Sequence, residues 1–308
     1  MSMPPCLRRI LAAPTAGLVL ALWLLAGLGA GPARAGGPAL LAAVTIAPQA
    51  YFVNQVAGSR VRVLVMVPPG ASPHAYEPRP RQLAELSRAA VYFTVGLELE
   101  RAWLPRFKSA NPRLLVVHTE AKVPRVPMLA RRQGHRAAGH RGLDPHIWLD
   151  PRLVIIQARA IMEGLCRVDP AGRERYRTGF QRFRKRCLDL DRRLRGLLAG
   201  LQGRRVLVYH PAWGYFCRAY GLAQVPVQRE GKSPGPRQLA RLIDQARRVG
   251  AKVVFVQPGF STRGAEMVAR AVGAKVVPLD PLAPDWAENL KRVARAIRKA
   301  LESKGGPS

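Results

Sequence analysis

Short apolar runs alternate with amphipathic segments in the first half of the chain, and Pro, Gly or polar breaks separate them. Runs of this length that are rich in Val, Leu and Ile are typical of buried strands, whereas apolar residues every three or four positions are typical of helices. Their alternation predicts a parallel sheet flanked by helices. The predicted strands are Leu40–Ile46, Val61–Val67, Val91–Val95 and Leu114–Val117, and the predicted helices are Gln49–Ala57 and Arg81–Ala89.

The same alternation returns in the last third of the chain. It again favours a mainly parallel sheet covered by helices. The fold class is therefore α/β with two lobes, and no internal repeat is visible. The predicted strands of the second lobe are Arg205–Tyr209, Val253–Val256 and Lys275–Pro278, and its predicted helices are Pro236–Val249 and Ala265–Val272.

Between the two lobes lies the most regular stretch of the sequence, and it predicts one long linker helix within residues 169–202. Its apolar residues recur at steps of four and three, which places them on one stripe of a helix. A two-stranded coiled coil is the alternative, but the stretch holds fewer than four heptads, so we favour a strut inside one chain. The stripe consists of Tyr176, Phe180, Phe183, Cys187, Leu190, Leu194, Leu197 and Leu201.

Two Asp-Pro pairs mark predicted helix starts. Asp150 precedes Pro151, and Asp169 precedes Pro170 at the start of the linker helix. Aspartate is a favoured N-cap and proline is favoured at the first helical position. We therefore interpret both aspartates as helix caps and not as metal ligands.

The N-terminal 35 residues have the pattern of a signal peptide. Arg8 and Arg9 precede the apolar run 17–28, and residues 33–35 (Ala-Arg-Ala) supply a small-x-small cleavage site. Cys6 lies before the apolar run, so it cannot become the lipidated first residue of a mature lipoprotein. We expect cleavage after residue 35, a periplasmic or otherwise extracytoplasmic protein, and lobes at 36–168 and 203–308.

The three cysteines that remain after residue 35 allow one disulfide at most. Cys166, Cys187 and Cys217 form no C-x-x-C pair, so a thiolate zinc site has no support. We expect them to be buried as small apolar residues, although export would permit a bridge.

The chain is strongly basic, with 50 Lys and Arg against 19 Asp and Glu and a net charge of +31. Nucleic acid is the usual partner of such a chain. Here the arginines are scattered without RNA-type aromatic motifs or zinc-finger spacing, and the chain carries an export signal. We therefore exclude nucleic acid, and note that the charge favours contact with an anionic membrane surface.

Four candidate metal ligands follow predicted strands or lie in breaks between elements: His74, His146, His210 and Asp280. Open α/β sheets bind ligands beyond the carboxyl ends of their strands, so two facing lobes could bring these loops together. Three imidazoles and a carboxylate suit Zn²⁺, which accepts nitrogen and oxygen ligands in tetrahedral geometry. Glu77 and Glu230 could accept hydrogen bonds from the ligand imidazoles or be solvated carboxylates, whereas His118 has no motif around it and is interpreted as structural.

The segments around the four candidates resemble the zinc/manganese solute-binding proteins of ABC importers, in order from about residue 40 to 300. That resemblance implies two α/β lobes bridged by one long helix, with a metal ion clamped by the residues matching His74, His146, His210 and Asp280. Members of the manganese type tend to carry a carboxylate at the position of His210, so a histidine there favours zinc, with manganese possible. The segments are Pro73–Pro78, Asp144–Pro151, His210–Phe216 and Leu279–Leu282.

Two features depart from that family's pattern. Many zinc-type members carry a long loop rich in histidine and acidic residues, whereas residues 121–142 here offer only His135 and His140 among several arginines. Gln257 stands where members often have glutamate. A metal-gathering loop is therefore not expected, and the charge that a glutamate would place near the metal is missing.

The predicted function is capture of a divalent metal, zinc first, and its delivery to an ABC permease with its cytoplasmic ATPase by a monomeric protein that is not an enzyme. The alternatives are a manganese- or iron-binding member of the same family, a secreted zinc hydrolase and a metal-linked adhesin. A hydrolase needs a general base beside an open zinc position, and the sequence holds no H-E-x-x-H motif.

Overall fold

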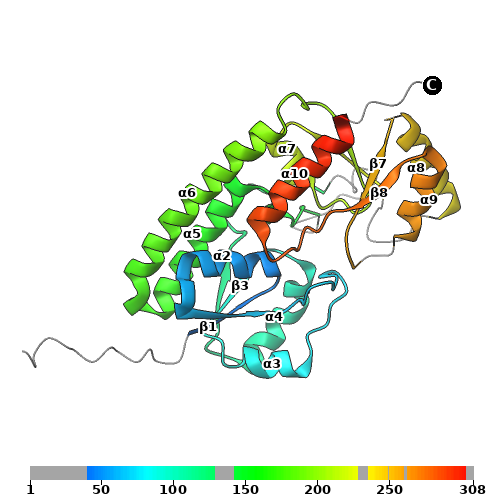
Figure 1. The fold of residues 1–308 in the computed structure, drawn as a ribbon. Coiled ribbons are helices and arrows are strands. Elements are labelled where there is room, and N and C mark those ends of the chain that lie inside the picture. Colours follow the sequence, from blue (N-terminus) through cyan, green and yellow to red (C-terminus); the bar gives the residue numbers. More distant parts are fainter. Residues whose placement is uncertain (1–39, 129–141, 228–234, 249, 260–261, 303–308) are drawn as a thin grey trace, which may run out of the picture. The chain divides into compact units, whose positions relative to one another are not determined.

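The strands of the structure are short and apolar, and each pairs in parallel with its neighbours. The computed structural model describes residues 40–128, 142–227, 235–248, 250–259 and 262–302 (Figure 1). They form two four-stranded sheets, of order β2-β1-β3-β4 and β6-β5-β7-β8. The strands are β1 (Leu40–Val44), β2 (Val61–Val65), β3 (Val91–Thr94) and β4 (Leu115–His118), then β5 (Arg205–Val208), β6 (Ala223–Pro226), β7 (Val253–Val256) and β8 (Lys275–Pro278).

Helices connect the parallel strands, so the predicted α/β class with two lobes is confirmed. The first lobe has α2 (Ala47–Ala57), α3 (Pro80–Leu86), α4 (Glu98–Ala110) and α5 (Pro151–Val168). Past the long helix α6 (Arg173–Leu197) come α7 (Gly214–Ala219), α8 (Pro236–Arg248), α9 (Arg263–Val272) and α10 (Trp286–Glu302). None of the helices in the described residues is long and apolar enough to cross a membrane.

The first strand is two residues shorter than the sequence predicts, because a side chain competes for its backbone. Gln49 accepts hydrogen bonds from the backbone N–H groups of Thr45 and Ile46, and α2 begins at Ala47 instead of Gln49. Ser87 similarly donates its hydroxyl to the carbonyl of Ala84, where α3 ends three residues before the predicted boundary.

The predicted linker helix is present as α6, which is 25 residues long. Its apolar stripe is buried against α5, α2 and α10, as Tyr176 and Leu194 at 0% exposure show. The helix ends at Leu197, and the last residue of the predicted stripe, Leu201, is buried outside it.

The interpretation of the two aspartates as caps is right for one and wrong for the other. Asp150 accepts a hydrogen bond from the N–H of Arg152 and caps α5. Asp169 is not the N-cap of α6, because a short 3-10 turn separates the two and its carboxylate pairs with Arg60 and Tyr176. It is instead the C-cap of α5, where its backbone N–H donates to Leu165. The guanidinium of Arg60 lowers the pKa of Asp169 to about 2.

The last helix carries the chain back onto the first lobe. Trp286, the first residue of α10, packs edge-on to Phe52 of α2 with ring centroids 5.1 Å apart, and also contacts Phe183 of α6. Neither α4 nor α10 was among the predicted helices.

The three cysteines form no disulfide with one another. Cys187 and Cys217 are buried, as predicted, whereas Cys166 is only partly buried.

Candidate metal centre

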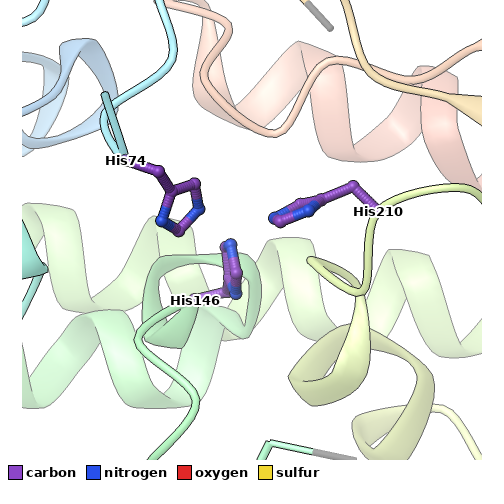
Figure 2. A group of neighbouring side chains, drawn as sticks. All are labelled: His74, His146 and His210. Carbon is purple, nitrogen blue, oxygen red and sulfur yellow. The ribbon is translucent and has the colours of Figure 1, made fainter. Parts of the chain in front are cut away.

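Three of the four predicted ligands lie together. His74 lies in the loop between β2 and α3, His146 immediately precedes the 3-10 turn 147–149, and His210 follows β5 (Figure 2). Each offers one ring nitrogen, and these atoms all lie within 4.8 Å of one another. The ring centroids of His74 and His210 are 5.2 Å apart and those of His146 and His210 are 5.5 Å apart.

Small rotations of the three histidine side chains would bring their ring nitrogens to the spacing that a bound metal ion requires. Tetrahedral zinc with Zn–N bonds of about 2.0 Å needs nitrogens about 3.3 Å apart. Three loops that are distant in sequence therefore aim nitrogen donors at one point. No other group of three or more His, Cys, Asp or Glu with such spacing occurs in the described residues.

A buried carboxylate fixes the orientation of His146. Asp144 and His146 are each 3% exposed, and Asp144 Oδ1 lies 2.7 Å from His146 Nδ1. Since an ionised carboxylate only accepts hydrogen bonds, Nδ1 carries the proton and the lone pair of Nε2 is available to a metal. The backbone N–H of His146 donates to the same oxygen at 3.0 Å.

The segment after His210 makes room for that carboxylate. A Cβ on Gly214 would lie 2.8 Å from Asp144 Oδ2, so only glycine fits at this position. The Tyr215 hydroxyl donates to the backbone carbonyl of Asp144 at 3.1 Å. The loop that carries His210 therefore also positions the residue that orients His146.

His210 itself is held at the carboxyl end of β5. It is 6% exposed, and the N–H of the preceding residue, Tyr209, donates to Phe255 of β7 at 2.7 Å. After it, the N–H of Trp213 donates to the side chain of Gln224 at 2.7 Å. These hydrogen bonds fix the backbone before and after His210, and so the position from which its imidazole extends.

The loop of His74 is more open than the other two. The residue is exposed, and the N–H of Ala75 donates to Ser72 within the same loop. Although the residue as a whole is exposed, protein atoms surround its ring, and this desolvation lowers the pKa of His74 to about 4, with a further contribution from the repulsion of protonated His146. A neutral imidazole at pH 7 keeps the lone pair that a metal requires.

Asp280 lies outside the group in which all ligand atoms are within 4.8 Å. Its Oδ1 accepts a hydrogen bond from the N–H of Leu282 at 2.8 Å, and burial raises its pKa. Its loop nevertheless touches the loop of His146, because Trp148 Nε1 donates to the carbonyl of Pro281 at 2.7 Å. Asp280 as the fourth ligand stays a prediction.

The remaining candidates divide by location. Glu77 is exposed and Gln257 is 6% exposed, while His118 contacts Thr94 and Glu120 instead of the three histidines. Glu230, His135 and His140 lie outside the described residues, as do residues 1–35. Asp144 was not proposed from the sequence, although its place two residues before a candidate ligand is a signal that could have found it.

Two parallel α/β lobes with one long helix between them match the fold of solved structures of ZnuA and of a periplasmic zinc-binding protein of Treponema pallidum. The chain belongs to the family described as zinc-uptake complex component A, periplasmic, whose model matches residues 43–300.

Individual relatives agree with this assignment. A crystal structure of ZnuA superposes with a TM-score of 0.80 at 39% identity, covering 85% of this chain and 99% of that one. The high-affinity zinc uptake system protein ZnuA of Bacillus subtilis is 26% identical over 260 residues, which are 82% of this chain and 81% of that protein. The solute-binding protein FpvC of Pseudomonas aeruginosa, solved in complex with Mn²⁺, has a TM-score of 0.74 at 25% identity and covers 87% of this chain and 100% of its own.

Proposed function

We propose that this protein captures Zn²⁺ outside the cytoplasm through His74, His146 and His210, with Asp280 as the fourth ligand, and delivers it to an ABC-type permease and its ATPase. The observation that carries the proposal is the convergence of three ring nitrogens within 4.8 Å from loops of both lobes. Membership of the zinc-uptake family supports the transport role.

Zinc is favoured over manganese by the donor set. Imidazole nitrogen suits zinc, whereas manganese prefers carboxylate, carbonyl and water oxygens. A relative that binds Mn²⁺ keeps manganese as the alternative cargo. The captured ion is the transported substrate, so the protein needs no catalytic group, and the hydrolase is not proposed.

The proposal includes how the protein reaches its place of work. Residues 1–35 direct export and are removed, which leaves a monomer with lobes at 36–168 and 203–308 and the linker 169–202 between them. The family assignment and the signal-like composition of the N-terminus support this. The adhesin alternative stays a prediction. It would be supported if the protein remained on the cell surface after all four ligands were changed to alanine.

The test uses protein recovered from the extracytoplasmic fraction. Its metal content and its affinities for Zn²⁺ and Mn²⁺ in chelator competition are measured for the unchanged protein, for His210→Ala and for His118→Ala. We expect tight Zn²⁺ binding, and a loss for His210→Ala greater than the about 10- to 100-fold that an outer contact supplies. His118→Ala is the matched control, because it removes an imidazole outside the centre and should bind Zn²⁺ normally.

Each result decides a different part of the proposal. Unchanged Zn²⁺ affinity in His210→Ala removes that residue from the centre. A preference for Mn²⁺ over Zn²⁺ assigns manganese as the cargo, and metal-dependent hydrolysis of esters or peptides overturns the transport role.

A further inference from the structure

The surface of α6 carries a row of arginines that the metal centre does not use. Arg175, Arg182, Arg186 and Arg193, named here the arginine row, are all exposed. They recur at steps of seven, four and seven, so at 100° per residue they lie within about 40° of one another on the helix. The row is about 27 Å long at a rise of 1.5 Å per residue.

The arginine row lacks the acidic partners that other cations of α6 have. Arg177 pairs with Glu174, and Arg195 pairs with the buried Asp191. No guanidinium of the row lies within 4.0 Å of a carboxylate belonging to a described residue. Apart from Arg193, which also acts electrostatically on Glu288, these guanidinium groups have their charge available to a partner outside the molecule.

The row also borders a cavity of suitable chemistry. Arg175, Arg182 and Arg186 line a cavity of about 310 Å³ together with residues 54–59, where α2 ends. A guanidinium nitrogen of Arg186 donates to the side chain of Gln55 and is thereby turned toward α2. Three guanidinium groups beside amide and hydroxyl side chains form a site for an oxyanion, because arginine matches the oxygens of phosphate in a bidentate geometry.

We propose that the arginine row docks the protein on a bilayer that contains anionic phospholipid, with a headgroup phosphate in this cavity. A straight row of cations meets many headgroups on a flat anionic surface, and the large excess of basic residues, which remains after residues 1–35 are removed, attracts the whole molecule to it. The lining of the cavity includes no aromatic side chain on which a base could stack, so single-stranded nucleic acid fits less well. Docking would keep the protein near a membrane importer.

Binding to vesicles tests the proposal. The exported protein is mixed with vesicles of phosphatidylcholine alone or with added phosphatidylglycerol, and the bound fraction is measured by sedimentation at low and high salt. A variant that carries Arg175→Gln, Arg182→Gln, Arg186→Gln and Arg193→Gln is compared with a control that loses the same charge on α8 and α9. The control changes are Arg237→Gln, Arg241→Gln, Arg263→Gln and Arg270→Gln, all at exposed positions.

We expect binding only to the anionic vesicles and weakening by salt. Each basic residue near the surface should strengthen binding to the anionic vesicles roughly fivefold, so the row variant should bind them about a hundredfold or more weakly. The control variant should lose much less of its vesicle binding. A second variant with lysine at the four row positions should keep most of the binding, which separates lost charge from a damaged fold.

Three results overturn the proposal. They are no preference for anionic vesicles, equal losses in the row variant and the control, and tighter binding of single-stranded DNA than of vesicles. Free inorganic phosphate that removes the protein from vesicles at equal phosphate concentration would assign the cavity to a soluble anion instead of a lipid.

Discussion

At the scale of single residues, the orientation of His146 depends on one buried carboxylate. Asp144 accepts from both the ring and the backbone N–H of His146. The ionised carboxylate fixes the tautomer and makes Nε2 a stronger donor to a metal.

We predict that Asp144→Asn weakens Zn²⁺ binding by about 10- to 100-fold, because an amide holds the imidazole without the negative charge. Chelator competition measures this affinity. Asp150→Asn is the matched control, since the Asp150 side chain accepts from the N–H of Arg152 and caps α5, a role that asparagine also fills, so the affinity should not change. Equal affinities for the unchanged protein and Asp144→Asn would show that the carboxylate only shapes the loop.

The sequence identified three of the central side chains but not the residue that aims one of them. His74, His146 and His210 were proposed from their loops and from the family resemblance, and the structure brings them together. The place of Asp144 two residues before His146 was the only signal for it, and a carboxylate before Pro145 also suits an ordinary turn. Its role depends on burial beside Gly214 of the other lobe, which local sequence does not reveal.

At the scale of elements, α6 packs closely against α2 because Gly179 has no side chain at the point of contact. A Cβ on Gly179 would lie 2.0 Å from the carbonyl oxygen of Val56, so the helices approach each other as closely as their backbones permit. Gly196 lies on the same helix with nothing within 4 Å of the corresponding point.

We predict opposite effects for the same substitution at these two glycines. Gly179→Ala should lower the free energy of unfolding by about 1 to 3 kcal/mol, because overpacking exceeds the gain in helix propensity. Gly196→Ala should raise it by roughly 0.5 to 1 kcal/mol. Urea unfolding followed by circular dichroism measures both, and stabilisation by Gly179→Ala would mean that α2 moves aside without cost.

The sequence analysis missed α4 and α10 for different reasons. In α4, Pro105 and many charges obscure the helix, which begins where Glu100 accepts hydrogen bonds from the N–H groups of Gly96 and Leu97. In α10 the buried Leu290, Val293, Ala294 and Ile297 have helical spacing, so that helix could have been predicted. Every described strand except β6 was predicted, because the central strands of each sheet are buried and form continuous apolar runs. β6 is four residues long and includes the polar Gln224, so its pattern gave no strand signal.

At the scale of the molecule, two reciprocal contacts join the segments around His146 and Asp280. Trp148 donates to Pro281, and Trp286 donates to the carbonyl of Trp148, both at 2.7 Å. No local sequence pattern predicts these two hydrogen bonds, because each joins residues more than a hundred positions apart. The sequence could predict two lobes and a linker but not the return of α10 to the core of the first lobe.

The lobes also meet beside the candidate metal centre, at two glycines. Gly70 lies in the loop that carries His74, and Gly259 follows β7 in the second lobe. A Cβ on Gly259 would lie 2.4 Å from the carbonyl oxygen of Gly70. A side chain at residue 259 therefore requires the loop of His74 or the segment after β7 to shift.

We predict that Gly259→Ala weakens Zn²⁺ binding, because a displaced His74 leaves two imidazoles to hold the ion. Gly259 also has a φ of +84°, so alanine at this position adds backbone strain. Gly200→Ala is the control that measures the effect of such strain alone. Gly200 has a φ of +78° with nothing within 4 Å of the added Cβ. Both variants should lose about 1 to 2 kcal/mol of stability through that strain, but only Gly259→Ala should lose affinity in chelator competition. Normal affinity in Gly259→Ala would mean that the His74 loop closes on the ion independently of the second lobe.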